Sequence, residues 1–368
     1  MSNSGFHEKS FDDGTLCKLE MYRKYLRAWL PTFINNPYID TIQIFDFFAG
    51  PGYDGEDNPG SPIIASQEIR IALDGGVCRA GMKVKLFLNE LDKNKYKALQ
   101  TNAAVIRDAN PEIDVITDNR EFSEVFFDNL PVMSRLRVAN FLFLDQFGVS
   151  EITQRVFESM INLDKTDFIF FISAAIINRV KEHPDIVKYI PPISKDDWQR
   201  MTGNNVNRIL SDAYQQWIPV NKNYYLGNFS IKKGANVYGL IFGSGHPFGI
   251  HKFLHVAWEK GGDANFDIDG DKIDENQPVL FDFLNKPTKI TEFEHAFEAK
   301  VLQRELVNNK QVYIFSLQHG VLASHARDAL KNMCKDGKLP NQCFHISYDA
   351  WKKNGDEPII YNGEEGKQ

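Results

Sequence analysis

Four acidic residues stand at the ends of four successive apolar segments in the first half of the sequence. They are Asp46, Glu90, Asp118 and Asp145. Apolar segments separated by amphipathic ones predict parallel strands that are covered by helices on both faces. In an open parallel sheet a ligand binds beyond the carboxyl ends of the strands, so these four carboxylates are candidates to hold one.

The loop after the first of these segments reads Asp46-Phe47-Phe48-Ala49-Gly50-Pro51-Gly52. Its glycines allow the backbone to approach a ligand without a clash from a Cβ atom. S-adenosylmethionine carries an ammonium group, ribose hydroxyls and an adenine amino group, all of which donate hydrogen bonds to carboxylates. The pattern predicts that Asp46 and the loop hold the amino-acid end, Glu90 the ribose and Asp118 the adenine amino group. The predicted cofactor-binding residues are Asp46, Phe48, Ala49, Gly50, Pro51, Gly52, Glu90, Asp118 and Asn119.

Two alternatives exist for these residues. Each acid taken singly could instead cap the helix that follows it, as Asp118 or Asp92 could. The stretch from Gly50 to Gly55 also matches the glycine pattern of NAD and FAD sites, in which the helix starts within the glycines. Pro59 and Gly60 oppose a helix before Ser61, and together with the set of acids this favours S-adenosylmethionine.

The fourth segment ends with Leu144-Asp145-Gln146-Phe147-Gly148. Enzymes that methylate exocyclic amines place an acid or amide at this point, followed by prolines and an aromatic residue. We therefore predict Asp145 and Phe147 as catalytic residues, one accepting the amine hydrogens and the other stacking on the base. The prolines are missing, and the alternative is that Asp145 only lines the pocket while Phe147 packs under the next helix.

The element pattern positions these residues in an α/β fold of the Rossmann-like methyltransferase type. Strands are expected at 41–48, 83–89, 113–117, 138–145 and 167–173, with helices between them, and the segments 223–231 and 235–242 predict a closing hairpin. This gives a seven-stranded, mostly parallel sheet preceded by an amphipathic helix from about Leu16 to Phe33. The expected domains are a helical lead-in at 1–38, a methyltransferase domain at 39–260, a connector at 261–288 and a C-terminal domain at 289–368.

The C-terminal part predicts a small winged helix-turn-helix. Its apolar spacing indicates short helices, followed by a strand at Phe344-His-Ile-Ser347. The segment from Ala296 to Gln342 contains seven Lys and Arg and four acidic residues. It is therefore locally basic in a chain whose net charge is −7. We predict that His325, Arg327 and Lys331 bind nucleic acid, and the alternative is that they are surface positions of a dimerisation or docking module.

Composition excludes several other classes of protein. The four cysteines form no Cys-x-x-Cys pair, which argues against a zinc site or a disulfide framework. The segment from Asn265 to Asn276 lacks the first and last ligands of a calcium loop, and His246 and His251 have no third ligand at a suitable spacing, so no metal site is predicted. No apolar run is long enough for a membrane span, and we expect a soluble, cytoplasmic protein.

Several motifs together resemble one family. They are Lys18-Leu-Glu-Met-Tyr22, Phe45-Asp-Phe-Phe-Ala-Gly-Pro-Gly52, Gly60-Ser-Pro62, Asp145-Gln-Phe-Gly148 and His246-Pro-Phe-Gly249 with Trp258. In this order they resemble the three-Cys-motif partner proteins, in which a methyltransferase domain precedes a winged helix. The chain has Gln146 where that family has proline, which affects the geometry at Asp145.

The resemblance implies an S-adenosylmethionine-dependent methyltransferase that acts on nucleic acid with a partner similar to radical S-adenosylmethionine proteins. It identifies neither the nucleic acid nor the partner. The alternative is a non-catalytic protein of the same fold that recruits a partner enzyme to nucleic acid through its winged helix.

Overall fold

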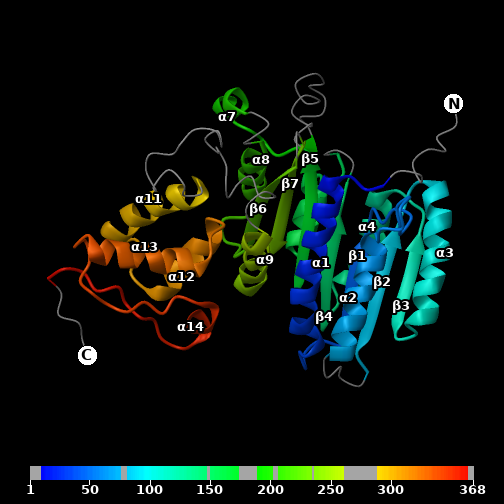
Figure 1. Cartoon of the computed structure of the whole chain (residues 1–368), viewed down its shortest axis with the longest axis horizontal. Helices are drawn as coiled ribbons and strands as arrows, with labels where there is room; N and C mark the ends of the chain where they lie inside the picture. Colours follow the sequence, from blue (N-terminus) through cyan, green and yellow to red (C-terminus); the bar gives the residue numbers. More distant parts are fainter. Residues whose placement is uncertain are drawn as a thin grey trace. The chain divides into compact units, whose positions relative to one another are not determined.

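The computed structural model describes residues 10–75, 81–146, 150–173, 189–201, 206–233, 236–260 and 288–363 (Figure 1). The chain forms two compact units, Met1–Lys252 and Phe253–Gln368. The domain boundaries predicted from the sequence, 38/39, 260/261 and 288/289, stay predictions.

The first unit is built on a seven-stranded sheet with the strand order β3-β2-β1-β4-β5-β7-β6. Strands β1 to β5 are parallel, whereas β7 runs antiparallel to both β5 and β6. This is the predicted Rossmann-like methyltransferase arrangement, with the hairpin closing the sheet, and the fold prediction is confirmed. The strands are β1 (Thr41–Asp46), β2 (Lys83–Asn89), β3 (Ile113–Asp118), β4 (Val138–Leu144), β5 (Thr166–Ser173), β6 (Tyr225–Lys233) and β7 (Asn236–Ser244).

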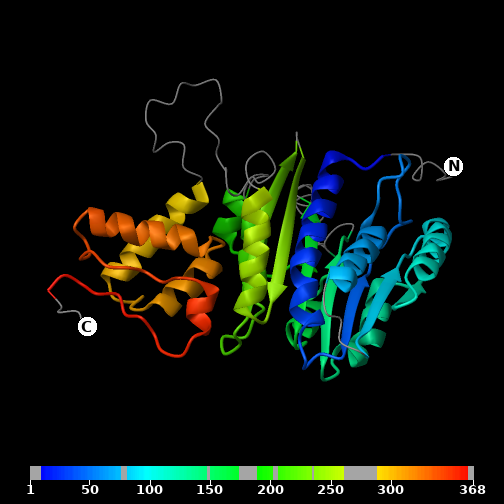
Figure 2. The same ribbon diagram turned by 60° about the horizontal axis from the view of Figure 1, so that its bottom comes forward.

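Helices connect the strands and cover both faces of the sheet (Figures 1 and 2). Helices α2, α3, α4 and α5 lie between successive parallel strands, as the alternation of segments in the sequence predicts. The helices of this unit are α1 (Asp13–Ile34), α2 (Ser61–Gly75), α3 (Lys93–Ala109), α4 (Phe122–Met133), α5 (Gln154–Ile161), α7 (Lys195–Arg200) and α8 (Val206–Gln215), and α9 (Pro247–Lys260) carries the boundary between the units.

Helix α1 packs along one face of the sheet. Asp12 caps its first turn by accepting a hydrogen bond from the backbone N–H of Thr15 at 2.7 Å. Its side chains Tyr22, Tyr25 and Trp29 recur at helical spacing and are at most 1% exposed. Their ring centroids lie 5.5 to 5.9 Å from that of Phe141 on β4, so the helix is held against the centre of the sheet.

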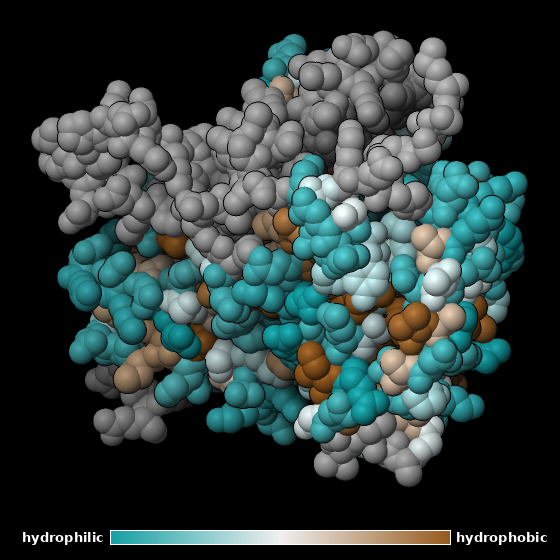
Figure 3. Space-filling model, turned by 45° about the vertical axis from the view of Figure 1, so that its right-hand side comes forward, coloured by the Kyte–Doolittle hydropathy of each residue, from teal (hydrophilic) through white to brown (hydrophobic). Residues whose placement is uncertain are grey.

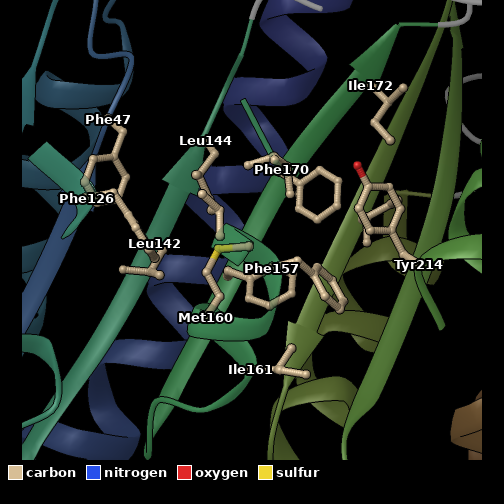
Figure 4. Packing of buried hydrophobic residues seen from close by; sticks show 14 of the residues in the cluster. Phe47, Phe126, Leu142, Leu144, Phe157, Met160, Ile161, Phe170, Ile172 and Tyr214 are labelled. Carbon is tan, nitrogen blue, oxygen red and sulfur yellow. The ribbon is translucent and has the colours of Figure 1, made fainter. Parts of the chain in front are cut away.

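The opposite face carries the main core (Figure 4). Side chains of β1, β4 and β5 meet those of α4, α5 and α8 there, in a cluster rich in phenylalanine. Fully buried members include Phe47, Phe126, Leu142, Phe157, Phe170 and Tyr214. Because α1 and this cluster lie on opposite faces, residues of β4 alternate between them. Phe141 and Phe143 face α1, and Leu142 and Leu144 face the cluster.

The second unit contains four described helices after α9. They are α11 (Thr288–Leu302), α12 (Asn309–Gln318), α13 (Ala323–Lys335) and α14 (Tyr348–Lys352). The predicted strand at Phe344–Ser347 is wrong, because side chains satisfy the backbone of this segment. Arg327 donates to the carbonyl oxygen of Ile346 at 3.0 Å, and Asn309 donates to that of His345 at 3.1 Å. Among the described residues of this unit, an isolated bridge forms between Asn308 and Pro358.

The exposed apolar side chains are spread over several elements. They include Ile71 on α2, Leu91 before α3, Val105 on α3 and Leu136 before β4. On the face in Figure 3, small hydrophobic areas are separated by hydrophilic ones. Within the part of the chain that the structure describes, no helix is long and apolar enough to cross a membrane.

Candidate cofactor and methyl-acceptor site

The glycine loop is fixed to the neighbouring strand β2. The N–H of Ala49 donates to the carbonyl oxygen of Asn89 at 2.9 Å, and the N–H of Gly50 donates to Oε2 of Glu90 at 2.9 Å. Gly50 has a φ of +65°, and a Cβ added there would meet no atom of the described residues within 4 Å. The loop therefore has an open side next to Gly50, on which a ligand can approach the backbone.

Gly52 is required for close packing. Its φ is +107°, and a Cβ would lie 2.8 Å from Nδ2 of Asn102 on α3. The same Nδ2 donates to the carbonyl oxygen of Pro51 at 2.8 Å. The carbonyl of Gly52 accepts a hydrogen bond from the N–H of Gly60 at 2.7 Å, so the loop returns on itself before α2 begins.

Asp54 organises the excursion between Gly52 and Gly60. Its carboxylate accepts hydrogen bonds from the backbone of Glu56, Asn58 and Phe11 and from the side chain of Asn58. Burial acts to raise the pKa of Asp54, but these bonds outweigh it and lower the pKa to about 2. Helix α2 begins at Ser61, as predicted, so its N-terminus does not start within the glycines as the dinucleotide motif requires.

Asp46 lies fully buried at the end of β1. Its Oδ1 accepts the N–H of Phe48 at 3.3 Å, whereas Oδ2 has no hydrogen-bond partner among the described residues. Burial raises the pKa of Asp46 to about 7, the nearby Ser61 hydroxyl and the Phe48 N–H act to lower it, and Asp145 and Glu90 add to the rise. A buried carboxylate oxygen without a donor is a suitable acceptor for an ammonium group.

Glu90 and Asn119 hold the loops together. The carboxylate of Glu90 also accepts the N–H of Asp92 at 2.8 Å, and Asn119 donates through Nδ2 to the carbonyl oxygens of Glu90 and Leu91. Each oxygen of Glu90 thus has one backbone donor and keeps lone pairs for further bonds. The predicted ribose acceptor therefore lies directly beside the glycine loop.

Asp118 and Asp92 differ in their roles at helix starts. Asp92 caps α3 by accepting from the N–H groups of Asn94 and Lys95, both at 2.9 Å. Asp118 does not cap α4, and its carboxylate instead pairs with Arg120 at 2.8 Å. Asp92 is thus a helix cap, as the alternative holds. Asp118 is not, and its carboxylate is already paired with Arg120.

Asp145 follows β4 and is paired with a residue of α1. The ammonium of Lys18 lies 2.6 and 2.7 Å from the two oxygens of Asp145. Next to it, Gln146 is 6% exposed, and neither polar atom of its amide has a partner among the described residues. Phe147, the other predicted catalytic residue, lies outside the described residues.

The sequence analysis used Lys18 and Tyr22 only as part of a motif on the lead-in helix and gave neither residue a role at the site. Tyr22 is fully buried, and its hydroxyl has no partner among the described residues. Burial raises the pKa of Tyr22, and the negative charge of Asp46 raises it further. The spacing of four residues between a lysine and a tyrosine on one apolar helix face is the signal that could have identified them. No group of three or more potential metal ligands occurs among the described residues.

The predicted nucleic-acid residues on α13 have unequal exposure. His325 accepts the N–H of Leu322 at 3.2 Å, and its ring lies 4.4 Å from that of Trp258. Burial lowers its pKa. The guanidinium of Arg327 donates to the carbonyl oxygen of Ile346. Lys331 is exposed, and its ammonium lies 3.4 Å from the carboxylate of Asp328.

Comparison with known proteins gives a family match for the C-terminal part of the chain and remote structural similarity for the fold. Residues 265–342 match a family described as the GMT-like wHTH domain. No curated protein sequence matches the chain. The winged helix-turn-helix assignment thus rests on a family match as well as on the helices of the structure.

Solved structures with similarity include protein LPL1258 from Legionella pneumophila, with 11% identity, a TM-score of 0.40 and coverage of 68% of this chain and 92% of that one. The methyltransferase domain of METTL16 has 10% identity, a TM-score of 0.31 and coverage of 61% and 83%. A putative O-methyltransferase from Klebsiella pneumoniae has 8% identity, a TM-score of 0.31 and coverage of 64% and 90%. At these scores the fold assignment rests on the strand order of the chain itself.

Proposed function

We propose that the chain is an S-adenosylmethionine-dependent methyltransferase. The observation that carries the proposal is Oδ2 of Asp46, which is buried and has no hydrogen-bond partner among the described residues, at the start of a glycine loop whose Gly50 has no described residue against its free side. The ammonium of S-adenosylmethionine would satisfy this oxygen, and Glu90 beside the loop has lone pairs for ribose hydroxyls. Asp118 and Asn119, at the end of β3, would bind the adenine.

Bound S-adenosylmethionine supplies a methyl group activated by its sulfonium sulfur. The protein has to orient the nucleophile and exclude water. Asp145, at the end of the neighbouring strand, would accept a hydrogen bond from the N–H of an amine nucleophile. Phe147 would stack on the group that carries this amine.

We further propose that the substrate is a nucleic acid. The support is the winged helix-turn-helix match and the excess of Lys and Arg between Ala296 and Gln342. A partner protein with a three-cysteine motif follows only from the sequence resemblance to the three-Cys-motif partner proteins, and co-purification of the full chain with such a protein would test it.

Calorimetric titration of the full chain with S-adenosylmethionine and S-adenosylhomocysteine tests the proposal. We expect both to bind the wild type, and Gly50→Val to weaken both by at least about 1.4 kcal/mol, a factor of ten, because its side chain would fill the open space and strain the loop. Gly81→Val is the matched control, since Gly81 also has a positive φ and no described residue within 4 Å of an added Cβ, but precedes β2. Absence of binding by the wild type would exclude the proposal.

A further inference from the structure

The Lys18–Asp145 ion pair places an internal cation on the carboxylate that is predicted to accept the hydrogens of the amine substrate. Lys18 is 9% exposed, and its ammonium lies against both oxygens of Asp145 and 5.1 Å from the centre of the Phe171 ring. The side chain of Asp145 keeps 26% of its surface exposed. The carboxylate is thus paired on one side and accessible on another.

The groups around this pair share one face of the sheet. Lys18 and Tyr22 lie one turn apart on α1, and the Tyr22 ring lies 4.1 Å from that of Phe143. Asp145 follows Phe143 by two residues, and Asp46 is the register partner of Phe143 on β1. Two carboxylates, one ammonium and one phenol therefore meet at the carboxyl edge of β1 and β4.

The ion pair with Lys18 changes the kind of nucleophile from which Asp145 can accept a hydrogen bond. An unpaired, partly buried carboxylate favours an ammonium ligand, because the charge-assisted bonds stabilise both groups. With Lys18 in place the pair has no net charge, and an added ammonium would lie close to a like charge. The remaining lone pairs of Asp145 can still accept a hydrogen bond from an uncharged N–H group.

We propose that Lys18 is a specificity-determining residue that selects a neutral amine or amide, such as the exocyclic amino group of a nucleobase, over a cationic amine such as a lysine side chain or a polyamine. The inference rests on the proposed methyltransferase function and deepens it. It assigns α1 to the substrate site and names the charge of the group that is methylated.

Sinefungin and S-adenosylhomocysteine test this without a known substrate. Sinefungin carries an ammonium-bearing carbon where S-adenosylmethionine carries the sulfonium methyl, and S-adenosylhomocysteine has no charge there. We expect the wild type to bind the two ligands with affinities within about threefold, and Lys18→Met to prefer sinefungin by at least about tenfold, the scale of a hydrogen bond to a charged group. The ratio of the two affinities cancels losses that affect both ligands equally.

Three further variants control the result. Lys18→Arg keeps the cation and should retain the wild-type ratio, as should Lys24→Met on an outer position of α1. The double variant Lys18→Met/Asp145→Asn should return to the wild-type ratio, because the unpaired carboxylate is gone. If Lys18→Met does not fold, Lys18→Gln replaces it.

The possible failures are distinguishable. A wild type that binds neither ligand overturns the proposed function and this inference together. Binding of both ligands with an unchanged ratio in Lys18→Met overturns the inference alone. A wild type that already prefers sinefungin by tenfold or more would also overturn it, since Lys18 would then not neutralise the acceptor.

Discussion

Asp46 and Asp145 are both acids at strand ends, but they have different surroundings. Asp145 has a cation within 2.7 Å on both oxygens, whereas Asp46 is fully buried, and among the described residues it accepts a 3.3 Å bond from the N–H of Phe48 with the Ser61 hydroxyl nearby. Because the pKa of Asp46 is raised to about 7, its proton is lost close to neutral pH. The role proposed for Asp46, to accept an ammonium group, requires an ionised carboxylate, so ligand affinity should depend on pH.

This linkage predicts a pH-dependent affinity for S-adenosylhomocysteine. Affinity should increase roughly fivefold to tenfold between about pH 6 and about pH 7.5, as Asp46 ionises, and calorimetry in buffers of different ionisation enthalpy should detect proton release. Asp46→Asn should bind weakly with a flat profile. An affinity that falls with rising pH would contradict the role of Asp46.

Ionisation of Asp46 also affects folding. The pKa of the folded state lies above that of an exposed aspartate, so the folded state holds the proton more tightly than the unfolded chain does. The free energy of unfolding should therefore decrease as the pH rises from about 4 to about 7. In Asp46→Asn this contribution should be absent, which urea denaturation at several pH values can measure.

At the scale of elements, helix α1 is held by a buried polar contact. The hydroxyl of Tyr25 donates to Oδ2 of Asp167 at 2.7 Å, and burial raises the pKa of Asp167 to about 6 although Ser244 and Tyr25 donate to it. Tyr25→Phe removes one donor from a buried carboxylate, so we expect a loss of about 1–3 kcal/mol in the free energy of unfolding. Urea denaturation measures it. Tyr38→Phe, at an exposed position, should have no effect, and equal stabilities of the two variants would contradict the role of Tyr25.

The sequence predicted the sheet and the glycine loop but not the contacts made by α1. Periodicity identifies strands and helices because each buries a regular set of apolar residues, and Pro59 and Gly60 locate the start of α2. The Lys18–Asp145 pair joins residues that are 127 positions apart, and no local pattern encodes such a contact. Phe344–Ser347 has strand-like alternation, but its backbone groups are bound by Arg327 and Asn309. Side chains distant in the sequence therefore overrode local propensity.

At the scale of the whole molecule, the acidic chain has a local excess of positive charge, with seven Lys and Arg and four acidic residues between Ala296 and Gln342. A chain with a net charge of −7 should bind nucleic acid only where Lys and Arg gather, and Lys331 is the exposed basic residue among the three predicted on α13. Its surface pair with Asp328 at 3.4 Å stabilises little and leaves the ammonium available for a phosphate. Binding of the full chain to DNA or RNA should therefore depend on this residue.

Fluorescence anisotropy with labelled single-stranded RNA, single-stranded DNA and duplex DNA would measure this binding. Lys331→Glu should weaken it for every sequence tested and reduce the slope of log K against log salt by about one, as expected for one lost phosphate contact. Lys353→Glu makes the same charge change at an exposed position after α14 and should leave the slope unchanged. Equal effects of the two substitutions would mean that net charge, rather than α13, governs the association, and the winged helix would then have to act on a protein partner.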